Sequence, residues 1–162
     1  MRFGIGLLIE RFGPLLVSAL VAAAFVHWRE ALLVEAAIHK IQPSNLYGAI
    51  FNWSAIQVGF AFGVYGFILS KSDGFVGEVR GTIAMKRFIT YVRRGTLGGF
   101  LLTIASIPIT AIGPDPAATK FAFYLLTAWF ALFVWTFLAF IRIAFGFGRL
   151  VSVPDREPFY GA

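Results

Sequence analysis

Cysteine is absent from this chain of 162 residues, and charged residues make up only 14% of it. The lack of cysteine excludes disulfides, thiolate metal sites, iron–sulfur clusters and cysteine nucleophiles. Soluble domains carry roughly 25% charged residues. The low charge, together with 59% hydrophobic residues, therefore excludes a water-soluble monomer. A mean hydropathy of +0.80 indicates an integral membrane protein.

The sequence also lacks the motifs of common catalytic and cofactor sites. It contains no nucleophile elbow, phosphate-binding loop, dinucleotide-binding glycine motif or zinc-binding HExxH. Only two histidines are present, and His27 and His39 would lie roughly 18 Å apart along one straight helix. We therefore expect neither enzyme activity nor a bound metal or cofactor.

Four apolar stretches are long enough, or nearly long enough, to cross the hydrocarbon core of a bilayer, which needs about 20 residues of helix. They are residues 12–28, 46–70, 96–112 and 121–145. Neither a repeat nor a low-complexity linker separates them. We expect one all-α transmembrane domain over residues 1–162, a bundle of four membrane-spanning helices that ends in a short cytoplasmic tail at residues 149–162.

The distribution of charge along the chain predicts its orientation. Of the 14 Lys and Arg residues, all except Arg29, Lys40 and Lys120 belong to the N-terminus, the segment between the second and third spans, or the C-terminus. Basic residues are enriched on the cytoplasmic side of a membrane. We therefore expect both termini in the cytoplasm, in a multi-pass protein of a bacterial inner (plasma) membrane.

The two loops expected on the outer side differ in character. Residues 113–120 contain a glycine and two prolines, which predicts a tight turn between antiparallel helices. Residues 29–44 favour a helix that prolongs the first span, with Pro43 as its stop signal.

The segment from Ile83 to Arg94 has the pattern of a basic amphipathic helix, which Gly95 joins to the third span. Apolar side chains fill most of one side, and the cations gather opposite them within a sector of about 120°; these cations are Lys86, Arg87, Arg93 and Arg94. Such a helix binds anionic lipid headgroups at a membrane surface. Docking of an acidic cytosolic protein is an open alternative, whereas the scarcity of aromatic residues between the cations disfavours nucleic acid.

Gln57 has the strongest hydrogen-bonding side chain near the centre of the second span. Its amide needs partners inside the bilayer. The third span offers a polar stripe at spacings of four, three and four residues, formed by Gly99, Thr103, Ser106 and Thr110. Two interpretations stay open. These residues line a path for water or a substrate, or they hold helices together through hydrogen bonds and close backbone approach.

The second span also contains a GxxxG motif, made by Gly59 and Gly63. Two glycines one turn apart offer a flat groove for another helix, from this chain or from a second subunit. Gln57 projects from a different side of the same helix, so the span has two faces to cover. Four helices alone do not readily cover both, which favours a homo-oligomer.

The leading hypothesis is a non-enzymatic, oligomeric membrane subunit whose basic cytoplasmic loop binds anionic lipid and recruits or senses a cytosolic partner. The alternative is a small channel, pore-forming effector or transporter with its path lined by Gln57, Thr103, Ser106 and Thr110. The first hypothesis depends on exposed cations and the second on a polar interior. The positions of the cations and of the polar residues in the fold therefore bear on both hypotheses.

Overall fold

A computed structural model describes the backbone of residues 5–71 and 74–153, and the side chains of residues 12–71 and 75–153. All regular secondary structure in this part of the chain is helical. The elements are α1 (Ile5–His27), α2 (Arg29–Ile38), α3 (Pro43–Ser70), α4 (Gly74–Val79), α5 (Ile83–Ile112) and α6 (Lys120–Val151). The prediction of an all-α fold is confirmed for these residues.

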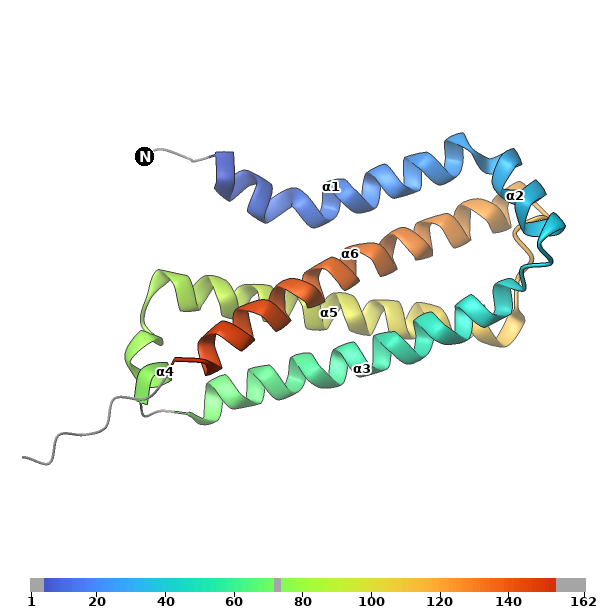
Figure 1. The fold of residues 1–162 in the computed structure, drawn as a ribbon. Helices are drawn as coiled ribbons and strands as arrows, with labels where there is room; N and C mark the ends of the chain where they lie inside the picture. Colours follow the sequence, from blue (N-terminus) through green and yellow to red (C-terminus); the bar gives the residue numbers. More distant parts are fainter. Residues whose placement is uncertain (1–4, 72–73, 154–162) are drawn as a thin grey trace, which may run out of the picture.

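The four long helices run alongside one another in alternating directions (Figure 1). Helix α3 packs along α5, and α6 packs against both α5 and α1. The end of the molecule where α3 ends, α5 begins and α6 ends is called the basic end below. Helix α1 packs mainly on α6, so it lies at the side of a core made by α3, α5 and α6.

Two apolar clusters of buried side chains fill that core. The cluster away from the basic end is built around Tyr47, Leu102 and Trp129 from three different helices. The cluster near the basic end contains Ile68, Met85, Val92 and Ile143, again from α3, α5 and α6. The core therefore runs along the helix bundle, while many large apolar side chains remain on its outside.

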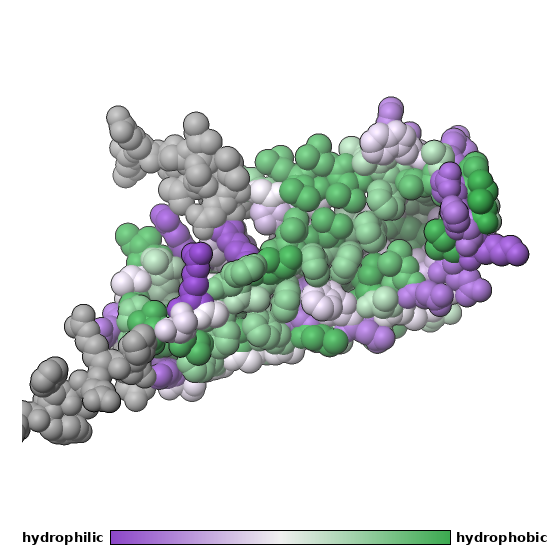
Figure 2. All heavy atoms as spheres, viewed as in Figure 1, coloured by the Kyte–Doolittle hydropathy of each residue, from purple (hydrophilic) through white to green (hydrophobic). Residues whose placement is uncertain are grey.

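Three helices, α3, α5 and α6, are each long and apolar enough to cross a membrane. The fourth candidate is α1 together with α2, and these two helices meet at an angle of 75°. The expectation that residues 29–44 prolong the first span is therefore wrong, because the chain bends at Trp28. On the face seen in Figure 2, hydrophobic residues cover the middle of the molecule and hydrophilic residues collect towards both ends. The complete four-span bundle and its orientation remain predictions.

The expected spans lie inside the observed helices, but several boundaries differ. Residues 46–70 belong to α3, residues 121–145 to α6, and residues 96–112 form only the second half of α5. Pro43 does not stop a preceding helix, since α2 ends at Ile38 and Pro43 is the first residue of α3. Proline suits that position because the first helical N–H has no partner within the helix. In the predicted tail, Arg149 to Val151 continue α6, and residues 154–162 lie outside the described residues.

The predicted turn at residues 113–120 is confirmed. Helix α5 ends at Ile112, and Gly113 follows with a left-handed φ of 62°, which glycine adopts without steric cost. The Tyr47 hydroxyl donates a hydrogen bond of 2.6 Å to the carbonyl oxygen of Pro114. Helix α3 thereby fixes the turn that makes α5 and α6 antiparallel neighbours.

Candidate functional site

The four predicted cations all lie in the first half of α5 and are all exposed to the surroundings of the protein. They are Lys86, Arg87, Arg93 and Arg94. Among the side chains that the structure describes, the two ion pairs join Arg29 to Glu30 and His39 to Glu35, near the opposite end of the molecule. These four cations at the basic end thus form no ion pair with a described carboxylate.

The apolar side of this segment packs inside the protein. Met85 is 4% exposed and Val92 is fully buried, and both contact the cluster around Ile143. Nor does the helix end at Gly95: α5 continues through it to Ile112. The predicted separate helix on the lipid surface is therefore the start of a longer helix, which is long and apolar enough to cross a membrane. Its amphipathic pattern reflects burial against α3 and α6.

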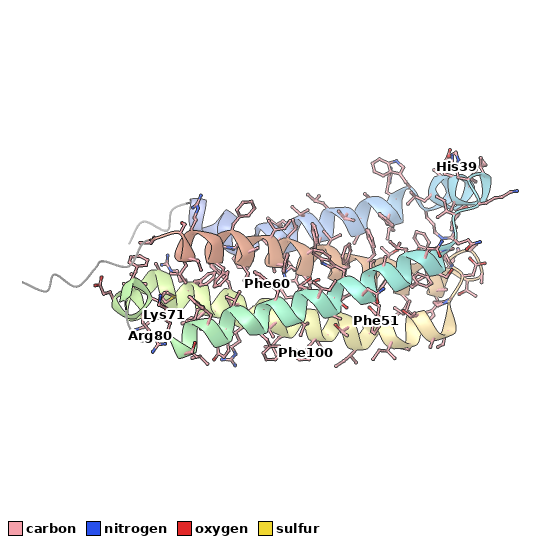
Figure 3. All side chains as sticks on the ribbon, turned by 60° about the horizontal axis from the view of Figure 1, so that its bottom comes forward. His39, Phe51, Phe60, Lys71, Arg80 and Phe100 are labelled. Carbon is pink, nitrogen blue, oxygen red and sulfur yellow. The ribbon has the colours of Figure 1, made fainter. Side chains whose placement is uncertain are left out.

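Arg80, a further basic residue of the segment between α3 and α5, has a structural role. Its guanidinium donates hydrogen bonds to the carbonyl oxygens of Ile68, Leu69 and Lys71, at 3.0 Å for the last two. These carbonyls belong to the last turn of α3 and its C-cap, where no following N–H is available within the helix. Arg80 and Lys71 lie together at the basic end in Figure 3, far from His39.

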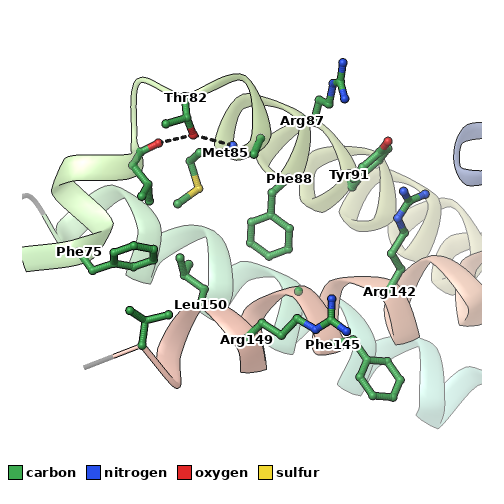
Figure 4. Close-up of a pocket in the computed structure, with 14 residues that line it drawn as sticks. Phe75, Thr82, Met85, Arg87, Phe88, Tyr91, Arg142, Phe145, Arg149 and Leu150 are labelled. Carbon is green, nitrogen blue, oxygen red and sulfur yellow. Dashed lines mark hydrogen bonds between the residues drawn. The ribbon is translucent and has the colours of Figure 1, made fainter. Parts of the chain in front are cut away.

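A cavity of about 930 Å³ opens at the basic end between α4, the start of α5 and the end of α6 (Figure 4). Its floor is apolar and comes from all three helices. The floor residues include Phe75, Met85, Phe88 and Leu150, and Phe145, which is 71% exposed, lies at the rim. Three arginines, Arg87, Arg142 and Arg149, lie on the walls, and the cavity residues in the described part of the chain include no carboxylate.

The arginines are held on two opposing walls. Arg142 and Arg149 are seven residues apart on α6, so they project from nearly the same face, about 10 Å apart along the axis. The Arg142 guanidinium stands over the ring of Tyr91 in α5, 3.8 Å from its centroid. This contact is a cation–π interaction. It ties α5 to α6 at the edge of the cavity.

Two local features shape the cavity. Gly146 has no side chain, and a Cβ there would stand 2.6 Å from the Phe88 ring, so the glycine lets Phe88 reach α6. Thr82 caps α5 by accepting a hydrogen bond of 3.2 Å from the Met85 N–H, and its hydroxyl donates to Val79 O at 2.7 Å (Figure 4). These bonds fix the turn between α4 and α5, which closes one end of the cavity.

The predicted polar stripe of α5 does not stay together. Thr103 donates to Gly99 O and lies 2.9 Å from Ser54 Oγ of α3. Ser106 donates to Leu102 O and accepts a hydrogen bond of 2.9 Å from the Trp129 indole of α6. Thr110 is exposed on the outside of the bundle.

Gln57 bonds to a helix that the sequence did not suggest. Its Nε2 donates to the carbonyl oxygen of Thr136 in α6, at 3.0 Å, and the side chain is 2% exposed. Within the described part of the chain, its Oε1 and the Trp53 indole N–H, one turn earlier, are both buried without a hydrogen-bond partner. The central polar groups are thus packed between helices, with Ser54 and Ser106 fully buried.

The close helix contacts use glycines other than the predicted pair. A Cβ on Gly59 or Gly63 would meet nothing within 4 Å, and both glycines are exposed on α3. A Cβ on Gly98 would instead stand 2.4 Å from the Trp135 ring, and one on Gly99 would stand 2.8 Å from Val58. Sequence analysis named Gly99 in the polar stripe but missed Gly98, and it did not note that Gly95 and Gly99 form a second GxxxG motif.

In the described residues, no group of three or more His, Asp and Glu side chains is placed to hold a metal ion. Comparison of the chain with known protein families, curated proteins and solved structures gave no match. The case for a function therefore depends on the chain's own geometry, and above all on the cations and the apolar cavity at the basic end.

Proposed function

We propose that this chain is a non-enzymatic integral membrane subunit that binds anionic lipid headgroups of the cytoplasmic leaflet through its basic end. The observation that carries the proposal is the exposed group Lys86, Arg87, Arg93 and Arg94 on α5, which lies at the end of three apolar helices. Each Lys or Arg near an anionic membrane surface contributes about 1 kcal/mol to binding. The excess of basic residues at this end supports its cytoplasmic location.

The experiment compares thermal unfolding in bilayers of different charge. The wild-type protein is reconstituted in phosphatidylcholine alone and in an equal mixture with phosphatidylglycerol, and we expect the anionic mixture to raise the unfolding temperature. Replacing Lys86, Arg87, Arg93 and Arg94 with Gln should remove most of that increase. Lys40→Gln with Lys120→Gln, at the opposite end, should leave it unchanged. An increase that the four replacements do not reduce would contradict the proposal.

The same cations suit an acidic surface on a cytosolic protein, which is the recruiting role in the leading hypothesis. Co-purification of the membrane-embedded protein with cytosol at low salt tests this role. A partner whose binding depends on the four cations would add recruitment to lipid binding. Lipid-dependent stabilisation without such a partner would leave lipid as the ligand of the basic end.

We also propose that the protein is a homo-oligomer in which α3 of one subunit meets α3 of another. The supporting observation is that Gly59 and Gly63 are exposed on a membrane-spanning helix, with open space in front of both. Small residues on such a face let two helix backbones approach closely. The alternative of a channel receives less support, because the side chains of Gln57 and Ser106 are buried and bonded to neighbouring helices.

A further inference from the structure

We infer that the cavity between α4, α5 and α6 binds one anionic phospholipid, with an acyl chain on its apolar floor and the phosphate between Arg87 and Arg149. This inference depends on the proposed function and narrows it from a charged surface to a defined site. The cavity residues, their charge and their depth along the helices each support it.

The floor of the cavity matches a hydrocarbon chain. Its volume of about 930 Å³ is near the upper end of the range of about 300–1,000 Å³ that ligand pockets occupy. Phe75 from α4, Phe88 from α5 and Leu150 from α6 line the space, so apolar side chains meet it from every helix that forms it. A small polar ligand would leave this surface without a matching partner, whereas an acyl chain covers it.

The walls of the cavity match a phosphate. Arg87 and Arg149 come from opposite walls and are both exposed at the mouth. A guanidinium binds phosphate oxygens through two parallel hydrogen bonds. It gains less binding energy from a neutral headgroup surface. Arg142, held on the Tyr91 ring, adds positive charge beside them. None of the described cavity residues is acidic, so an anion is favoured over a zwitterion.

The cavity lies at the depth where headgroups lie. A helix crosses the hydrocarbon core in about 20 residues. Counted from Ile112, that length of α5 ends near Arg93, and counted from Lys120, that length of α6 ends near Ala139. Tyr91 and Arg142, which also line the cavity, stand two and three residues beyond these points, and Arg87 and Arg149 stand six and ten residues beyond them, about 9 and 15 Å. The cavity therefore begins at the edge of the hydrocarbon core, from which an acyl chain enters it, and extends through the headgroup layer, which is about 5–8 Å deep.

The experiment is native mass spectrometry of the full chain released from nanodiscs of equal phosphatidylglycerol and phosphatidylcholine. We expect one phosphatidylglycerol to stay bound to the wild-type protein. Arg87→Gln with Arg149→Gln should weaken its retention about thirtyfold, the effect of losing two cations at a lipid surface. Arg93→Gln with Arg94→Gln removes the same charge outside the cavity, and it should leave the bound lipid in place.

A second pair of variants changes the floor without changing charge. Ala84 lines the cavity and is exposed, whereas its neighbour Ile83 is 70% exposed and does not line it. Ala84→Trp should narrow the cavity and weaken retention, and Ile83→Trp should not. Wild-type retention by Ala84→Trp, or an equal loss with Arg93→Gln and Arg94→Gln, would overturn the site. If lipid binds only to the exposed cations of the basic end, phosphatidylglycerol should still raise the unfolding temperature when the cavity variants show no specific loss of retention.

The C-terminal segment is the other candidate occupant, because residues 155–160 include two acidic and two aromatic side chains. A variant that ends at Val153 separates the two occupants. Equal lipid retention with and without residues 154–162 supports the phospholipid. Retention that appears only after their removal would show that this segment fills the cavity, and would overturn the proposal.

Discussion

The side-chain amide of Gln57 in α3 donates its hydrogen bond to the backbone carbonyl of Thr136 in α6, at 3.0 Å. The pair joins two helices across the buried centre of the molecule, where Thr136 is fully buried as well. A glutamine at this depth therefore acts as a contact between helices. A substitution of Gln57 can therefore be tested for two separate effects, one on the stability of the protein and one on transport.

Gln57→Leu should change the free energy of unfolding by less than about 1 kcal/mol. The lost hydrogen bond is worth about 0.6 kcal/mol in a membrane protein, and the substitution also removes the unpaired Oε1. Gln57→Glu should cost about 3 kcal/mol, because it places an uncompensated charge in the interior. Thermal unfolding in detergent measures both variants. A wild-type ion flux in proteoliposomes that Gln57→Leu abolishes would contradict the packing role.

Gly98→Ala should destabilise the protein by about 1–3 kcal/mol through overpacking. The new methyl group would meet both the Trp135 ring, at 2.4 Å, and the Thr136 methyl, at 3.1 Å. Gly148→Ala is the matched control, because Gly148 lies inside α6 with open space in front of it. It should be neutral or stabilise α6 by about 0.5–1 kcal/mol. Equal unfolding temperatures for the two variants would show that α5 and α6 do not approach as described.

Arg80→Gln should lower the free energy of unfolding by about 1–2 kcal/mol. The substitution removes charge-assisted hydrogen bonds to carbonyls at the end of α3, and such bonds are each worth about 1.5–3 kcal/mol when well buried. The expected loss of stability is smaller than the sum of these values because the contacts are partly exposed. Arg93→Gln removes an exposed cation from the same region and should cost much less. Hydrogen exchange should report faster opening of the last turn of α3 in Arg80→Gln alone.

Gly59→Leu with Gly63→Leu should dissociate the proposed oligomer by filling the groove on α3. Gly48→Leu places the same bulk about 16 Å along the same face of α3, where the space is also open, and tests how far the interface extends. Sedimentation in detergent measures the number of subunits for each variant. A wild-type protein that sediments as a monomer at every concentration would contradict the interface, and so would an oligomer that survives both substitutions.

The sequence predicted the helices well where hydropathy alone decides them. The apolar runs in α3 and α6 are continuous, and the glycine and prolines after Ile112 end α5 where the loop was expected. The bend at Trp28 was missed, because good helix-forming residues stand on both sides of it. Nothing in the local sequence marks a break there, and α2 has no buried residue that would account for the bend.

The candidate site was only half predicted. The cations were found because their spacing along α5 is local. The separate helix predicted from the same periodicity was wrong, since a helix whose apolar side is buried against protein shows the same pattern. Gly95 suggested a boundary, yet it serves a close approach to Ile143 of α6. The cavity joins Arg87 to Arg149 across 62 residues of sequence, and no local pattern reveals such a pairing.

The orientation of the basic end is the claim on which lipid binding depends, and labelling of single cysteines tests it most directly. The chain has no native cysteine, so Ile83→Cys and Ala117→Cys place one thiol at each end without altering charge. In intact bacterial cells, an impermeant maleimide should label Ala117→Cys at once and Ile83→Cys only after the membrane is opened. Labelling of Ile83→Cys in sealed cells, with Ala117→Cys protected, would contradict the account.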